Sequence, residues 1–134
     1  MDRLIINVDG ASRGNPGPAA IGVTLKDALL RPLANISQSV GRTTNNQAEY
    51  RAMIAGLKKA IELGAQDVQV KSDSELLVRQ ICGSYRVKNK ELKPLYEEVK
   101  RLASSFKHCE VIYIPRELNY EADRLANSAL DKTQ

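Results

Sequence analysis

The sequence predicts an α/β fold: one domain over residues 1–134, built on a mixed five-stranded sheet with helices on both faces. Three strand-like segments come first and are joined by short connections, which predicts an antiparallel arrangement. Helical segments then alternate with two further short strands, an order typical of crossover connections between parallel strands. A chain of 134 residues is long enough for one ordinary hydrophobic core.

The first three strands are predicted from apolar runs and from alternation. Residues 3–9 contain the run LIINV and are predicted to form a buried strand. Residues 19–26 and 33–40 alternate between apolar and polar side chains, with a short turn at residues 27–32 between them. The glycines and prolines of GASRGNPGPA predict a loop between the first two strands.

The segment TTNNQAEYRAMIAGLKKAIELG predicts the most clearly marked helix of the chain. Thr44 and Gln47 match the S/T-x-x-E/Q capping box at its start. Gly64 occupies the place of a C-terminal cap. An apolar stripe at helical spacing predicts the face that packs on the sheet, formed by Tyr50, Met53, Ile54, Leu57 and Ile61.

The second half of the chain alternates between strands and helices. Residues 67–72 predict a strand that ends at Asp73, and SDSELLVRQI predicts a short helix with a capping box at Ser72 and Glu75. Residues 83–90 are polar and turn-like, residues 91–105 predict an amphipathic helix, and residues 109–114 predict a strand. Asn119 is expected to cap a last helix, whose inward side chains are Ala122, Leu125, Ala126 and Ala129.

Composition and charge restrict the class of protein. No apolar run approaches the roughly 18 residues of a membrane span, and the N-terminus lacks the apolar core of a signal peptide, so we expect a cytoplasmic protein without a membrane segment. For Cys82 and Cys109 we expect buried free thiols, because no Cys/His cluster suggests zinc and a disulfide is rare in a reducing cytosol. The net charge of +4 is by itself a weak indication of a nucleic-acid partner.

Four carboxylates occupy comparable points of the predicted elements. Asp9 ends the first strand, Asp73 ends the fourth, and Glu49 and Asp123 lie in the first turns of two helices. The helix dipole explains acids in first turns one at a time, but it does not account for Asp9. Strand ends and the helix starts that face them meet in an α/β sheet, so we expect the four acids to converge. Converging carboxylates repel unless a cation binds, and an all-oxygen set selects Mg²⁺ or Mn²⁺.

Basic residues crowd the segment after the second predicted helix: Arg86, Lys88, Lys90, Lys93, Lys100 and Arg101. A solvated helix face is the ordinary explanation of such a run. If the four acids hold metal ions, the remaining surface becomes considerably more basic. A patch that follows nucleic-acid phosphates is then the better explanation.

Four segments, DGASRGNPGPAAIG, TTNNQAE, SDSELLVRQ and NYEADRLAN, resemble in order and spacing the signature segments of type 1 ribonuclease H. The resemblance covers essentially the whole chain. It implies the ribonuclease H fold and a metal-dependent endonuclease that cuts the RNA strand of RNA–DNA hybrids, leaving 3′-hydroxyl and 5′-phosphate ends. It also implies Mg²⁺ as cofactor, replaceable by Mn²⁺, with two ions per site when substrate is bound. We expect a monomer.

The resemblance assigns roles to particular residues by segment match. The catalytic and metal-binding quartet would be Asp9, Glu49, Asp73 and Asp123. Contacts in the minor groove, where a 2′-hydroxyl distinguishes RNA from DNA, are implied for Gly10, Ser12, Asn15, Asn45 and Asn46. A pocket for a DNA-strand phosphate is implied for Arg42, Thr44 and Asn89.

The chain departs from the family pattern in two places. The interval ICGSYRVKNKEL is short and the chain has no Trp, so we expect the basic protrusion of some members to be absent. The loop IPRELNYEAD has no histidine. Arg116 and Glu117 stand there, as in short prokaryotic and archaeal members, and are expected to help the leaving group or the product depart. Some short members also cut double-stranded RNA. His108, the only histidine, is expected at the opposite edge of the sheet from the acids.

Three other functions compete with this interpretation. The same fold supports other nuclease or transposase-like activities, although the GNPGP and TNNQAE segments favour RNA contacts. A catalytically silent hybrid-binding module would be expected to have lost at least one acid, and all four are present. A purely structural metal protein would not need the groove-contacting asparagines.

Overall fold

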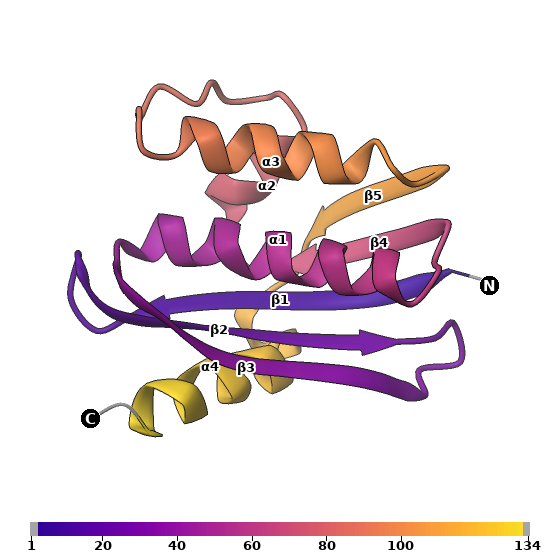
Figure 1. Cartoon of the computed structure of the whole chain (residues 1–134), viewed down its shortest axis with the longest axis horizontal. Coiled ribbons are helices and arrows are strands. Elements are labelled where there is room, and N and C mark those ends of the chain that lie inside the picture. The colour runs from indigo at the N-terminus through magenta and orange to yellow at the C-terminus, as the bar shows by residue number, and fades with distance from the viewer. Residues whose placement is uncertain (1–2, 133–134) are drawn as a thin grey trace.

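The computed structural model describes residues 3–132, and its centre is a five-stranded sheet in the order β3-β2-β1-β4-β5 (Figure 1). Strands β1 (Leu4–Ser12), β2 (Gly17–Lys26) and β3 (Pro32–Thr43) pair antiparallel. Strands β4 (Asp67–Ser72) and β5 (His108–Tyr113) continue the sheet in parallel with β1. The predicted mixed sheet, antiparallel first and parallel afterwards, is confirmed.

Helices cover both faces of this sheet, as predicted (Figure 1). Helix α1 (Asn45–Glu62) lies on one face, with α2 (Glu75–Ile81) and α3 (Lys93–Ala103) packed beside it. Helix α4 (Tyr120–Lys132) lies on the other face, against β1, β2 and β3. A short 3₁₀ helix, η1 (Arg116–Leu118), precedes α4 and was not predicted. None of the helices within residues 3–132 is long and apolar enough to cross a lipid bilayer.

The first three strands are longer than predicted. Strand β1 continues past Asp9 to Ser12, so Asp9 lies inside the strand, opposite Gly22 of β2, and does not end it. Only residues 13–16 connect β1 to β2. Most of the expected glycine-rich loop therefore belongs to the two strands of a hairpin. Backbone pairing with a neighbouring strand extended β1 beyond its apolar run, because ladder hydrogen bonds do not require apolar side chains.

Helix α1 begins and ends as predicted but packs on a slightly different face. The Thr44 and Gln47 capping box is present, and Gly64 has a φ of +84° after the last turn. Ile61 is 40% exposed, whereas Ala60 is buried. The buried face contains Gly56, where an added Cβ would lie 2.9 Å from the Ile6 side chain. Small residues thus let α1 approach β1 closely and set the direction of its buried stripe.

Three predicted boundaries were wrong near the shorter helices. Ser74, not Ser72, caps α2, because the Ser74 side chain accepts from the Leu77 N–H while the Ser72 side chain accepts from the Ser74 N–H. Helix α3 begins at Lys93 instead of residue 91, since the Asn89 side chain accepts from the Glu91 N–H and holds a turn there. Strand β5 starts one residue earlier than predicted, at His108.

The main core lies between the sheet and the helices α1, α2 and α3. Its β1 members are Leu4, Ile6 and Val8, all buried beneath α1. The alternate residues of β1, among them Asn7 and Asp9, therefore point to the face that α4 partly covers. Cys82 and Cys109 are free thiols, as expected, but the expected burial was wrong because Cys82 is exposed and Cys109 is only partly buried.

Candidate active site

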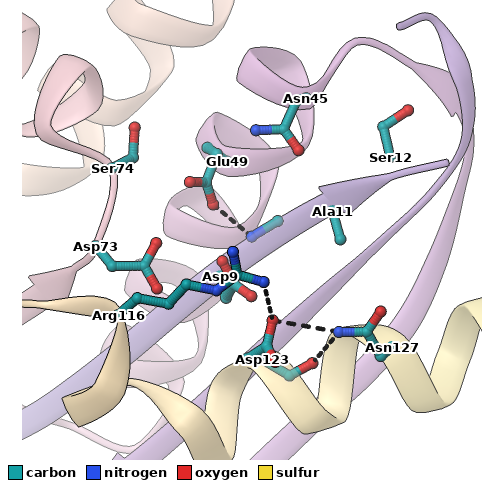
Figure 2. A pocket seen from close by; sticks show the side chains of 11 residues that line it. Asp9, Ala11, Ser12, Asn45, Glu49, Asp73, Ser74, Arg116, Asp123 and Asn127 are labelled. Atoms are coloured by element: carbon teal, nitrogen blue, oxygen red, sulfur yellow. Dashed lines mark hydrogen bonds and ion pairs between the residues drawn. The ribbon is translucent and has the colours of Figure 1, made fainter. Parts of the chain in front are cut away.

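Three carboxylates from distant parts of the chain meet beside β1. Asp9 comes from β1, Glu49 from the second turn of α1, and Asp73 from the residue after β4. Each offers an oxygen, and these oxygens all lie within 4.8 Å of one another (Figure 2). The parallel pairing of β1 with β4 ends at Val8 and Ser72, which brings Asp73 next to Asp9. Asp9 and Glu49 are buried, and Asp73 is partly buried.

Asp123, the fourth expected acid, approaches this cluster from α4. It is hydrogen-bonded to Asp9 and lines the same cavity, although it lies outside the set of three. The Asn127 side chain donates to the Asp123 backbone oxygen at 3.0 Å and to its Oδ1 at 3.2 Å. A guanidinium nitrogen of Arg116 lies 4.0 Å from the same Oδ1 (Figure 2).

Two glycines allow the helices to bring their acids to the sheet. A Cβ at Gly10 would lie 2.2 Å from the backbone of Ala48, so only glycine lets α1 rest directly on β1 there. The Gly10 N–H consequently donates to Glu49 Oε1 at 2.5 Å. On the other face, a Cβ at Gly22 would lie 2.0 Å from the Ala122 oxygen of α4. The close approach of both helices fixes where Glu49 and Asp123 stand relative to Asp9.

Asn119 directly precedes α4, as predicted for its cap, and its backbone oxygen accepts from the Asp123 N–H, but its side chain holds the third acid. Its side chain is 1% exposed and donates to Asp73 Oδ2 at 3.1 Å and to the Val8 oxygen at 2.9 Å. Neither Asn119 nor Asn127 was identified from the sequence as a site residue. Both could have been identified from their positions four residues before and after Asp123, because residues four apart lie on one side of a helix.

Burial and neighbouring charges raise the pKa of two of these carboxylates, Asp9 and Glu49. Burial raises the pKa of Asp9 well above the usual carboxyl range, and the charges of Glu49, Asp73 and Asp123 raise it further. Burial also raises the pKa of Glu49, although the Gly10 N–H opposes this. Within residues 3–132, no lysine or arginine forms an ion pair with Asp9, Glu49 or Asp73. The cluster therefore needs protons or a cation to balance its charge.

The carboxylates face a cavity of about 430 Å³. Gly10, Ser12, Asn45 and Arg116 also line it, as the sequence led us to expect (Figure 2). The Ser12 hydroxyl lies 2.9 Å from the Thr43 oxygen and also contacts the Gly14 oxygen, so it ties the β1–β2 turn to the end of β3. Glu117 is exposed and does not line this cavity, contrary to the expectation that it acts there.

A second cavity, of about 420 Å³, adjoins the first because Asn45 lines both. Besides Asn45, it gathers four more of the residues expected to contact nucleic acid, namely Asn15, Thr44, Asn46 and Asn89. The Asn15 side chain accepts from the Asn45 N–H at 3.1 Å and so joins the hairpin to α1. Arg42 is exposed on β3 opposite Pro18 and does not line this cavity.

Comparison with known proteins assigns the chain to a family. The model of a family described as reverse transcriptase-like matches residues 7–129. The crystal structure of RNase H1 from Halobacterium salinarum has a TM-score of 0.95 and 39% identity, covering 97% of this chain and 98% of that one. The chain belongs to the ribonuclease H family.

Two further members of the ribonuclease H family are similar over nearly the whole chain. LC11-RNase H1, solved in complex with an RNA/DNA hybrid, has a TM-score of 0.92 and 41% identity, covering 97% of this chain and 98% of that one. The bifunctional protein Rv2228c of Mycobacterium tuberculosis is 46% identical over 96% of this chain. This chain spans 36% of that protein, and therefore only about a third of its length.

In this ribonuclease H-family chain, the described structure has no basic protrusion between α2 and α3, as the sequence predicted. Residues 83–92 form only turns between α2 and α3. Arg86, Lys88, Lys90 and Lys93 are exposed there, whereas Lys100 donates to the Ile81 oxygen and Arg101 pairs with Glu98. His108 is exposed and lies opposite Asp67, at the other end of β4 from Asp73, as predicted.

Proposed function

We propose that this protein is a ribonuclease H that hydrolyses the RNA strand of RNA–DNA hybrids and leaves 3′-hydroxyl and 5′-phosphate ends. The observation that carries the proposal is the cluster of Asp9, Glu49 and Asp73, whose carboxylate oxygens lie within 4.8 Å of one another and form no ion pair with a basic side chain of residues 3–132. Family membership and the hybrid bound to the similar LC11-RNase H1 support the choice of substrate.

The donor set fits divalent metal ions. The cluster offers only carboxylate oxygens, which are hard ligands that suit Mg²⁺ or Mn²⁺ and do not suit zinc. We propose that Asp9, Glu49, Asp73 and Asp123 hold two ions when substrate is bound, with Mg²⁺ as the cofactor and Mn²⁺ able to replace it. When bound, such ions stabilise the charge that develops on the phosphodiester and activate the attacking water.

The remaining site residues would position the nucleic acid. Gly10 and Ser12 line the carboxylate cavity, Asn15 and Asn46 line the second cavity, and Asn45 lines both. All five are proposed to contact the RNA strand. Asparagine amides both donate and accept hydrogen bonds, which suits 2′-hydroxyls and base edges. A phosphate of the DNA strand is proposed to bind near Thr44, Asn89 and Arg42, with Arg42 reaching toward it from β3.

Arg116 is proposed to act on the reacting phosphate or the departing product. Its side chain is 81% exposed and lies at the rim of the carboxylate cavity, near Asp123. A guanidinium can pair with a phosphate oxygen through two hydrogen bonds. Glu117 is proposed to act only after movement of η1, since its side chain is exposed outside the cavity.

A cleavage assay on end-labelled duplexes tests the proposal. RNA–DNA hybrid, double-stranded RNA and double-stranded DNA are compared in Mg²⁺, in Mn²⁺, in Ca²⁺ and in chelator. We expect hybrid cleavage in Mg²⁺ and Mn²⁺ only, because the looser coordination of Ca²⁺ misplaces the reacting groups. Cleavage of plain duplex DNA would favour a different nuclease, and binding without cleavage would favour a silent module. The double-stranded RNA arm shows whether that duplex is also a substrate.

A further inference from the structure

The side chain of Asn119 is buried, and its hydrogen bonds go to segments that carry the acids. Its Nδ2 donates to the Val8 oxygen of β1 at 2.9 Å and to Asp73 Oδ2 at 3.1 Å. Its Oδ1 accepts from Asn7 Nδ2 at 3.1 Å. Its backbone oxygen accepts from the Asp123 N–H at 3.2 Å. One residue therefore links the strand of Asp9, the segment of Asp73 and the helix of Asp123.

The place of Asn119 in the sheet explains why an amide is needed there. The pairing of β1 with β4 ends at Val8 and Ser72, and beyond it Asp73 leaves the sheet. The Asn119 amide bonds both to the Val8 oxygen, at the end of this pairing, and to the departing Asp73 carboxylate. The Asn7 side chain fixes which end of the amide is the donor, because its own N–H binds Asn119 Oδ1.

We propose that Asn119 is a positioning residue that holds the Asp73 carboxylate in the orientation required for metal binding. This inference rests on the proposed function. Asp73 stands among like charges and would turn away from them unless it is held. The bond to Asn119 engages Oδ2 and leaves Oδ1, which makes no hydrogen bond within residues 3–132, available to a cation.

Asn119 acts through Asp73 and not as a ligand itself. It does not line the carboxylate cavity, and its only side-chain oxygen is already occupied by Asn7. Residues that orient a metal-binding side chain in this way change metal affinity or activity by roughly ten- to a hundredfold when they are removed. The effect is expected in the affinity for the ion more than in the rate at saturating ion.

Three variants separate this role from simple structural support. Asn119→Ala removes the donor, and Asn119→Asp keeps the size of the side chain but turns an acceptor toward the Val8 oxygen and Asp73. Gln80→Met is the control, because it breaks the buried bond from Tyr50 to Gln80 without touching the acids. For each variant we would measure Mn²⁺ binding to the metal-free protein by calorimetry, the Mg²⁺ concentration for half-maximal hybrid cleavage, and the melting temperature.

Asn119→Ala is expected to weaken Mn²⁺ binding by roughly ten- to a hundredfold. It is also expected to recover most of its cleavage at high Mg²⁺. Asn119→Asp should bind Mn²⁺ no better than the alanine variant, and Gln80→Met should bind it like the wild type. If Asn119→Ala is destabilised but binds Mn²⁺ with unchanged affinity, Asn119 only stabilises the fold. Tighter binding by Asn119→Asp than by wild type would make position 119 a ligand. Either result overturns the inference.

Mn²⁺ binding by an Asn7→Ala variant and by the wild-type protein provides two further tests. If neither position-119 variant folds, Asn7→Ala removes only the bond that orients the amide. It is then expected to weaken Mn²⁺ binding in the same direction by a few-fold, and unchanged affinity would overturn the inference. A wild-type protein that neither binds Mn²⁺ nor cleaves hybrid would instead contradict the proposed function.

Discussion

At the scale of single residues, the main feature is the close approach of three carboxylates. When ionised, Asp9, Glu49 and Asp73 repel one another. An isolated buried carboxylate would take up a proton or recruit a basic side chain. Here the guanidinium of Arg116 lies beside Asp123, and within residues 3–132 it forms no ion pair with any of the three. Substitutions at these acids should therefore separate activity from stability, since the groups that would bind metal also weaken the metal-free fold.

Asp9→Asn and Asp73→Asn are each expected to lower hybrid cleavage by at least roughly a hundredfold, because each removes a ligand for ions that contribute several kcal/mol to the reaction. The same changes remove like-charge repulsion, so the melting temperature of the metal-free protein should rise or stay constant. Glu97→Gln, an exposed acid on α3, is the charge-matched control. Substantial cleavage by either asparagine variant would contradict the metal-site assignment.

Substitutions of Arg116 and His108 are expected to differ sharply in their effect on cleavage, although both residues are basic. His108 stands at the far end of β5, so His108→Ala should keep cleavage within about twofold of wild type. Arg116→Ala removes a charged partner for a phosphate, worth roughly 1.5–3 kcal/mol, and should slow cleavage by about tenfold or more. Steady-state kinetics on a hybrid check both. A large loss in the histidine variant with normal metal binding would contradict the placement of His108 outside the active site.

At the scale of elements, the site depends on how closely two helices approach the sheet. Helix α1 rests on β1 at Gly10, and α4 rests on β2 at Gly22, which pairs with Asp9. Each contact leaves no room for a side chain. The helices that carry Glu49 and Asp123 are thus placed by backbone contact, and packing density sets their positions to a fraction of an ångström.

Gly10→Ala is expected to push α1 away from β1, because the added methyl would overlap the Ala48 backbone. Overpacking of this kind costs about 1–3 kcal/mol, and displacement of Glu49 should weaken Mn²⁺ binding as well. Gly41→Ala is the control: its Cβ would meet open space, and only its φ of +80° opposes the change. Denaturant unfolding and calorimetry measure the two effects. Unaltered metal binding in Gly10→Ala would show that the contact does not position Glu49.

The segment between α2 and α3 should supply the salt-sensitive part of hybrid binding. Lys88 and Lys90 are exposed there. The double variant Lys88→Gln/Lys90→Gln is expected to reduce the slope of log affinity against log salt by up to about 1.8, at about 0.9 per phosphate contact. Lys58→Gln/Lys107→Gln, at exposed lysines outside this segment, is the matched control. Equal slopes for the two double variants would mean that the phosphate contacts lie elsewhere.

At the scale of the whole molecule, the carboxylate cluster couples folding to pH and to metal. In the metal-free protein, burial and neighbouring charges raise the pKa of Asp9, and burial raises that of Glu49. Between about pH 4, where unfolded carboxyls titrate, and these raised values, the folded protein binds more protons than the unfolded chain. Its free energy of unfolding must therefore fall as pH rises through that interval.

Urea unfolding in chelator at pH 5.5, 7.0 and 8.5 checks this expectation. Stability should decrease from the lowest to the highest pH, and Asp9→Asn should make the decrease shallower. Added Mg²⁺ should oppose the decrease, because ions bind the ionised carboxylates and stabilise the folded state. A stability that increases with pH in chelator would contradict the assigned direction of both pKa shifts.

Much of this protein was determined by the sequence alone. Apolar periodicity with the lengths of the connections predicted the mixed sheet, and the capping box at Thr44 with Gly64 predicted the two ends of α1, because these patterns are local. The four acids could also be singled out, since a carboxylate such as Asp9 beside an apolar strand has few structural explanations. The resemblance of four segments to the family added the proposed substrate and the proposed groove-contacting residues, and the latter stay predictions.

Only the tertiary structure decided the rest. Strand β1 runs past Asp9 because its ladder with β2 continues, which is a long-range pairing that local pattern does not report. The sequence predicted Asn119 as a helix cap. Its side chain donates instead to the Val8 oxygen and to the Asp73 carboxylate, which lie more than forty positions away in the chain. Glu117 was expected in the site but lies outside it, because η1 turns its side chain to solvent. Hydrogen bonds and close contacts between distant segments depend on where the chain folds back, and the residue types by themselves do not specify that.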